Sequence, residues 1–126
     1  MLDRDQARRV LGSIRVGVGA AAVLAPSPAA AVCGISSSSD ARLLTRLFGV
    51  RELYLGARGL DAEVTDAELR LQGAVDALDG LLALAATISG ATPKRTAVLI
   101  GSATLAWLTL GHQARRPRRP ELSVVR

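Results

Sequence analysis

The side chains best suited to chemistry in this chain are charged groups that lie inside apolar segments. Asp76 and Asp79 are three residues apart in an apolar stretch, and Arg15 and Arg51 interrupt earlier apolar stretches in the same way. On membrane-spanning helices such ionisable groups are costly and need partners inside the bundle. The pattern therefore predicts an intramembrane charge cluster, composed of Arg15, Arg46, Arg51, Glu52, Asp76 and Asp79.

Two kinds of chemistry fit this cluster. In the first, the two aspartates pair with Arg15, Arg46 or Arg51 and neutralise charges that would otherwise prevent assembly, so the cluster is a structural lock. In the second, the same groups form a relay or a pocket for a proton, an anion or a lipid head group. We favour the lock, because no histidine or other second titrating group accompanies the charged set inside the apolar segments.

The other motifs do not support catalysis. The pattern Gly17-x-Gly19-x-x-Ala22 matches a relaxed dinucleotide fingerprint, but no alternation of strands and helices surrounds it. His112 stands at the end of an apolar segment without metal-ligand spacing, and the single Cys33 excludes an internal disulfide. We therefore predict that the chain is not an enzyme and has no metal site and no cofactor.

The composition favours helices embedded in lipid. Hydrophobic residues make up 49% of the 126 residues, with one Phe, one Trp and one Tyr, and the mean hydropathy is +0.29. The apolar mass is therefore Ala, Leu, Val and Gly, which suits helices that approach closely in a membrane. We expect an all-α fold, a four-helix transmembrane bundle with short loops and both termini in the cytoplasm.

Stop and start signals divide this bundle into four helices. Pro26 and Pro28 end the first helix, because proline lacks the amide donor. Thr65 or Asp66 caps the third, and Gly90 follows its end. Trp107 is expected at the membrane interface, near the end of the fourth helix. The predicted single membrane domain covers 10–111, with helices at about 10–25, 41–60, 67–88 and 94–111, and 27–40 as a polar connection.

Small residues mark the faces along which the helices should pack. Ser13, Gly17 and Ala21 recur every fourth residue in the first helix, while Gly49 and Gly56 are seven apart in the second. The second helix also carries Arg51 and Glu52 near its centre. Together these would cost roughly 5 to 7 kcal/mol on insertion, against a return of about 3 to 5 kcal/mol from the apolar residues. This helix therefore needs a neighbour of opposite charge.

Basic residues gather at the two ends of the chain, which has a net charge of +5. They lie in an N-terminal lead, 1–9, and in a tail, 112–126, that we expect to be disordered; the residues are Arg4, Arg8, Arg9, Arg115, Arg116, Arg118 and Arg119. Under the positive-inside rule both clusters are cytoplasmic anchors. This predicts a multi-pass protein of the bacterial inner (plasma) membrane. Its expected partners are membrane lipids and a larger membrane complex or further copies of the chain, with no nucleic acid.

A secretory signal is the alternative reading of residues 1–31. A basic start, an apolar stretch at 16–25 and the small residues after it have the order of a signal peptide. The membrane reading is preferred because the downstream segments are also apolar, and a four-helix bundle needs its first member.

Short stretches of the chain resemble a known family. RLFGVRELYLG and VDALD, together with Arg15 and the following Pro26, are similar to motifs of small actinobacterial four-helix integral membrane proteins that form a domain of unknown function. The resemblance covers about 11–111. It implies the four-helix membrane fold, and it supplies no function because the family has no established activity.

Three roles follow, in order of preference. The first is a structural or accessory subunit held by intramembrane Arg–Asp pairs. The second is a minimal oligomeric transporter or channel for a proton, an anion or a lipid head group. The third is a soluble helical module whose basic tail binds nucleic acid.

Overall fold

The computed structural model describes residues 2–115, and within them the chain is entirely helical. It forms five helices and no strand: α1 (Arg4–Leu24), α2 (Pro26–Val32), α3 (Ser39–Leu60), α4 (Asp66–Ile88) and α5 (Lys94–Ala114). The all-α fold class is thereby confirmed. The four predicted helices correspond to α1, α3, α4 and α5, while α2 is additional.

The start of α1 differs from the prediction, and its end leads directly into a further helix. The helix begins at Arg4 and not at residue 10, because Asp3 and Gln6 form a capping box that satisfies the first amides. The lead 1–9 is thus largely helical. Pro26 ends α1 as predicted, yet it also begins α2, since proline is preorganised for the first helical position. The axes of α1 and α2 are bent by 118°.

The remaining boundaries follow local capping chemistry. Thr65 caps α4, because its side chain and that of Glu68 form a reciprocal capping box. After α4 the chain turns at Gly90, whose φ of 76° lies in the region that glycine tolerates. At the C-terminal side, α5 continues to Ala114, three residues beyond the predicted end. Most of the predicted basic tail, 116–126, lies outside the described residues.

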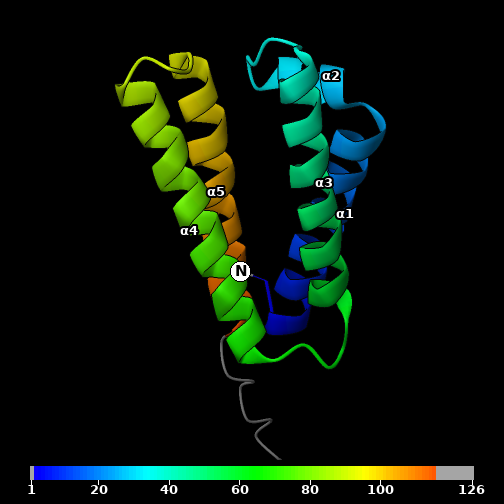
Figure 1. Cartoon of the computed structure of the whole chain (residues 1–126). Coiled ribbons are helices and arrows are strands. Elements are labelled where there is room, and N and C mark those ends of the chain that lie inside the picture. The colour runs from blue at the N-terminus through cyan, green and yellow to red at the C-terminus, as the bar shows by residue number, and fades with distance from the viewer. Residues whose placement is uncertain (1, 116–126) are drawn as a thin grey trace, which may run out of the picture.

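The helices form two layers that diverge (Figure 1). One layer contains α1 and α3, with α2 beside them, and the other contains α4 and α5; α1 also packs on α5. We call the end with the start of α1 and the α3–α4 link the narrow end. The opposite end, with α2 and the α4–α5 turn, is the wide end. There Thr96 donates to the Cys33 carbonyl at 2.6 Å and Arg95 to the Val32 carbonyl at 3.2 Å.

Glycines allow α1 and α3 to approach closely. A Cβ atom on Gly19 would lie 2.7 Å from the Gly49 carbonyl oxygen, and one on Gly56 would lie 2.8 Å from the Gly12 carbonyl oxygen. Gly49 and Gly56 therefore lie on the packing face that their spacing predicted. Their partners on α1 are Gly12 and Gly19, which have the same seven-residue spacing.

The predicted ridge of Ser13, Gly17 and Ala21 is not the packing face of α1. All three residues are exposed, and a Cβ on Gly17 would meet nothing within 4 Å. The cause is the rotation of α1 that buries Arg15. At about 100° per residue, Ser13 and Gly17 lie on the side of the helix opposite Arg15, whereas Gly12 and Gly19 share its side.

The apolar side chains are distributed in an unusual way for a folded chain. The buried ones are mainly alanines: Ala7, Leu11, Ala22, Ala30, Val64, Leu69 and Ala114. Most of the large ones are exposed, among them Leu44 at 66%, Leu81 at 64% and Leu105 at 68%. By length and composition α4 is the single described helix that could cross a membrane, and α1 with α2 adds a second span if that bent pair counts as one. Four spans therefore remain a prediction.

Glycine packing leads to a test with a control on the same helix. Gly19→Ala should lower the free energy of unfolding by about 1 to 3 kcal/mol, because its methyl group would overlap the backbone of α3. Gly17→Ala should be neutral or stabilising by up to about 1 kcal/mol, since it adds helix propensity in open space. Thermal unfolding of the two purified variants measures the difference. Equal midpoints would contradict the glycine contact.

Candidate functional site

A buried guanidinium joins three helices near the middle of the molecule. Arg15 of α1 donates from Nη1 to Glu52 of α3 at 2.8 Å and from Nη2 to Asp76 of α4 at 2.5 Å. Arg15 and Glu52 are 0% and 1% exposed, and Asp76 is 5% exposed. The two terminal nitrogens of one guanidinium therefore bind carboxylates from two different helices. All three charged groups lie away from the molecular surface.

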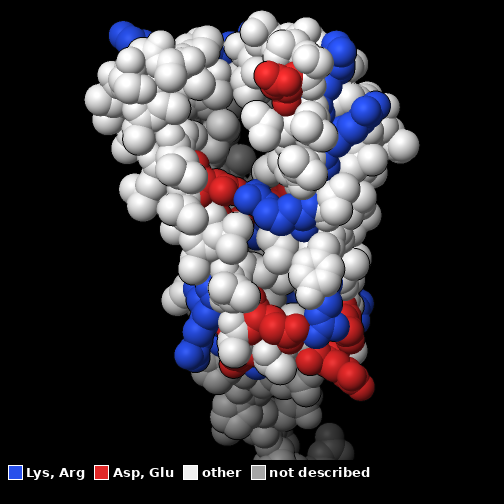
Figure 2. All heavy atoms as spheres, in the orientation of Figure 1, with Lys and Arg blue, Asp and Glu red and all other residues white. Residues whose placement is uncertain are grey.

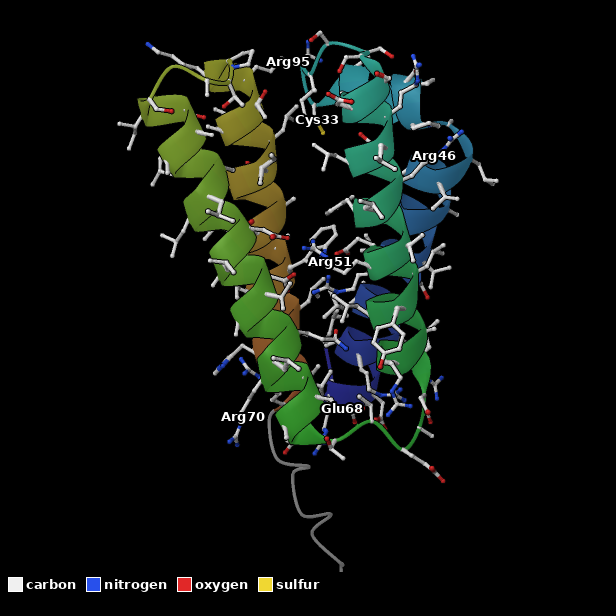
Figure 3. All side chains as sticks on the ribbon, in the orientation of Figure 1. Cys33, Arg46, Arg51, Glu68, Arg70 and Arg95 are labelled. Carbon is white, nitrogen blue, oxygen red and sulfur yellow. The ribbon has the colours of Figure 1, made fainter. Side chains whose placement is uncertain are left out.

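A second ion pair extends this arrangement towards the surface. Arg51 of α3 donates from Nη1 to Asp79 of α4 at 3.1 Å, makes a second contact with the same carboxylate, and reaches Glu52 Oε1 at 3.2 Å. About a third of the Arg51 and Asp79 side chains is exposed. Figure 3 shows Arg51 between α3 and α4, and Figure 2 shows positive and negative groups meeting at this level. We call the five residues Arg15, Arg51, Glu52, Asp76 and Asp79 the ionic cluster.

Helical spacing explains how each charge reaches the cluster. Asp76 and Asp79 are three residues apart and share one face of α4. In α1 the close-contact glycines stand three residues before and four residues after Arg15; in α3 they have the same offsets from Glu52. Each buried charge is thus centred on a face where the two backbones nearly touch, which brings the short Glu52 side chain within reach of Arg15. This shared spacing is the signal that sequence reasoning overlooked.

Aromatic rings complete the surroundings of the cluster. The Trp107 indole of α5 lies 3.5 Å from Glu52 Oε2 through Nε1, and the Arg15 guanidinium is 5.9 Å from its ring centre. The Arg51 guanidinium is 5.0 Å from the ring centre of Phe48. A cation over an aromatic face gains electrostatic attraction, more so away from water. Trp107 therefore lies near the middle of the molecule, and the prediction that it lies at the membrane interface near the end of the helix is wrong.

The charges of the cluster do not cancel. Three carboxylates face two guanidiniums, so the formal sum with all groups ionised is −1. Within the described residues, Nε of Arg15 and Nε of Arg51 are buried without a hydrogen-bond partner, as is Oε1 of Gln72. The cluster thus retains a surplus carboxylate and two donors that the pairs leave unused.

Arg46, which the sequence grouped with these residues, lies outside the cluster. It is exposed on α3, and its Nε is 3.4 Å from the Val23 carbonyl oxygen at the end of α1. Six residues separate it from Glu52, which places it about 120° around the helix. Figure 3 shows Arg46 at the outer side of α3, away from Arg51.

A second group of ion pairs closes the narrow end. Arg58 binds Asp61 at 2.6 Å and Glu68 at 2.5 Å, which links the end of α3 to the start of α4. Arg4 binds Asp66 at 2.8 Å. Arg8 donates to the carbonyl oxygens of residues 59 and 61, both at 2.8 Å, and so satisfies acceptors at the end of α3. These contacts hold the two layers together at the narrow end. Above the ionic cluster α3 and α4 diverge, and at the wide end Arg95 and Thr96 of α5 bind the carbonyl oxygens at the end of α2.

The divergence produces a groove of about 940 Å³ above the ionic cluster. Its walls come from all five helices and are mainly apolar, and its floor is formed by Arg51, Glu52, Asp76 and Asp79. Figure 2 shows the hollow between the two layers, directly above the charged band. The groove therefore combines a mainly apolar interior with a charged floor, and Asp40 lies at its wide end.

Comparison with family models, with curated proteins and with solved structures finds nothing similar to the chain. The described residues contain no group of three or more His, Cys, Asp or Glu side chains that could hold a metal ion. The site is therefore characterised by its geometry alone.

Removal of Arg15 tests the central pairing. Arg15→Gln should lower the free energy of unfolding by about 3 to 5 kcal/mol, because Glu52 and Asp76 would remain buried without their shared cation. The matched control is Arg46→Gln, which removes an exposed arginine from the neighbouring helix and should leave the unfolding midpoint nearly unchanged. Denaturant unfolding measures both variants. A midpoint for Arg15→Gln equal to that of the control would contradict the role assigned to Arg15.

Proposed function

We propose that the chain is a small integral membrane protein whose ionic cluster locks two helical layers together, and that it serves as a structural or accessory subunit. One observation supports this above all: charged side chains are buried while large apolar ones are exposed. A water-soluble monomer rarely exposes large contiguous apolar patches, because such surface is unfavourable in water. A lipid environment reverses this preference and makes unpaired charge the costly feature instead.

The dimensions of α4 agree with this proposal. Its 23 residues correspond to about 34 Å, against a hydrocarbon thickness of about 30 Å. Only 11% of the most apolar 18-residue stretch of α4 is buried inside the chain, whereas the core helix of a soluble protein is mostly buried. Asp76 and Asp79 lie near its middle, where a lone acid would cost about 2.5 to 3.5 kcal/mol. Pairing with Arg15 and Arg51 offsets that cost.

Ion pairing also affects whether the less apolar helix α3 can span a membrane. A hydropathy window counts Arg51 and Glu52 of α3 as two separate charges, although each has an oppositely charged partner within 3.2 Å. A paired and partly buried charge is less costly in lipid than an isolated one. This supports α3 as a span that depends on its neighbours for insertion.

The distribution of basic residues supports an orientation. The narrow end and the N-terminal half of α4 contain more of them than the wide end and the N-terminal half of α3 do; they are Arg4, Arg8, Arg9, Arg58, Arg70 and Arg115, against Arg42, Arg46, Lys94 and Arg95. By the positive-inside rule the narrow end would face the cytoplasm of a bacterial cell, in its plasma membrane. The family resemblance of RLFGVRELYLG and VDALD is part of the same proposal.

A transporter or channel is the second candidate. The observation in its favour is the groove, because it leads to a charged floor whose Arg51 and Asp79 side chains are about a third exposed. A purely structural lock would not need this access. The third hypothesis, a nucleic-acid-binding tail, falls mainly on residues outside the described part of the chain.

Cysteine labelling in intact cells tests both membrane insertion and orientation. On a Cys33→Ser background, Ser37→Cys places a thiol at the wide end and Ala62→Cys places one at the narrow end, both at exposed positions. A membrane-impermeant maleimide should label the first variant in intact cells and the second only after permeabilisation. Equal labelling of both before permeabilisation, or recovery of the protein in the soluble fraction, would overturn the proposal.

A further inference from the structure

We propose that the groove binds a lipophilic monocation, a molecule with an apolar body of drug-like size and one permanent or protonated positive centre. The inference goes beyond the structural role proposed above. It rests on the groove and its floor, which belong to the chain itself, so failure to bind would leave the membrane assignment untouched.

Size and lining define the body of the ligand. A volume of about 940 Å³ lies at the upper end of the range for small-molecule sites, about 300 to 1,000 Å³. The walls present apolar side chains from several helices, including Val18, Ala22, Leu44, Phe48, Leu82 and Ala103. Such walls offer dispersion contacts and few hydrogen bonds. They fit an apolar or aromatic body.

Charge defines the end of the ligand that reaches the floor. Glu52, Asp76 and Asp79 line the floor of the groove together with Arg51, and exposed Asp40, at the wide end, adds a further carboxylate to the lining. Arg15 lies behind them and brings the formal sum of the cluster to −1. One positive charge on the ligand would make the site neutral. A ligand with two positive charges, or an anion, would leave the cluster with a net charge, which is costly away from water.

The aromatic residues of the groove support the same choice. Trp107 and Phe48 both line it, and each already has a guanidinium within 5.9 Å of its ring centre. Aromatic faces attract cations, and quaternary ammonium ligands are commonly bound in this way. A cationic centre between the Asp79 carboxylate and these rings would gain from both.

A lipid acyl chain is the natural competitor, and it fits less well. It could fill the apolar walls, but its methyl end would meet the charged floor and leave the surplus carboxylate unmatched. A lipophilic cation instead places its charge at the floor and its apolar body along the walls. The groove lies between α3 and α4, which diverge, so such a molecule could enter from the side.

Two ions of the same shape and opposite charge provide the test. Tetraphenylphosphonium and tetraphenylborate are titrated separately into the purified full chain in an uncharged detergent. Trp107 is the single tryptophan and lines the groove, so its fluorescence reports occupancy. We expect saturable binding of the phosphonium, with the borate weaker by about tenfold or more.

Variants separate charge from shape. Asp79→Asn removes the surplus charge and should weaken phosphonium binding about tenfold, while Glu63→Gln removes a charge from the α3–α4 link, outside the groove, and should not. Because Asp79→Asn also weakens the pair with Arg51, a second variant leaves the cluster intact. Ala83→Phe fills the groove and should reduce binding, whereas Ala74→Phe, at an exposed position of α4 outside the groove, should have no effect.

Several results would overturn the proposal. Equal affinity for the two ions would show that charge does not select the ligand. Tighter binding of the borate would assign the groove to anions, attracted by the Arg51 guanidinium. No binding of either ion by a chain that is dimeric in detergent would indicate that a second copy covers the groove.

Discussion

The contact of the Arg15 guanidinium with Glu52 and Asp76 is the interaction on which the rest of the structure depends. Helix α4 does not pack extensively along either α1 or α3 in the described residues, and α5 is its main neighbour. Near the middle of the molecule, the direct links from the first layer to α4 are polar: two are ionic, through Arg15 and through Arg51 with Asp79, and one is the hydrogen bond from Gln72 to the Leu55 carbonyl oxygen. Apolar packing connects α4 to the first layer only indirectly, through α5, which packs on α1.

This ionic link has consequences for the surrounding helices. Burial of Arg15 sets the rotation of α1, and that rotation brings Gly12 and Gly19 against α3 and turns Ser13 and Gly17 outward. With the polar groups inside, the leucines of α3, α4 and α5 are left on the outer surface. Charges join α4 to the first layer at the cluster and at the narrow end, while the divergence of α3 and α4 above the cluster creates the groove. The ionic cluster that locks the layers and the groove above it therefore both follow from the burial of charged side chains between the layers.

Much of this could be predicted from residue types, and part could not. The helices and most of their ends follow from periodicity, proline and capping residues such as Thr65. The chain also brings together five of the six predicted cluster residues, because charges within apolar segments have few alternatives to one another. The specific ion pairs could not be predicted from the sequence. Three arginines and three acids allow many pairings, and only the rotation of each helix selects among them. That rotation also excludes Arg46 and determines which small residues of α1 touch α3. Helix α2 could not be predicted from Pro26, because proline both ends one helix and suits the first position of the next.

The most direct test of the lock is a double-mutant cycle between Arg15 and Asp76, with Arg15→Met and Asp76→Leu made singly and together. Glu52 keeps Arg51 as a partner throughout, so the cycle isolates the pair. The free energies of unfolding should show each single variant strongly destabilised and the double variant more stable than their sum predicts, with a coupling of about 1 to 3 kcal/mol. Strictly additive losses would mean that Arg15 and Asp76 do not stabilise one another, and the account built on their pairing would be wrong.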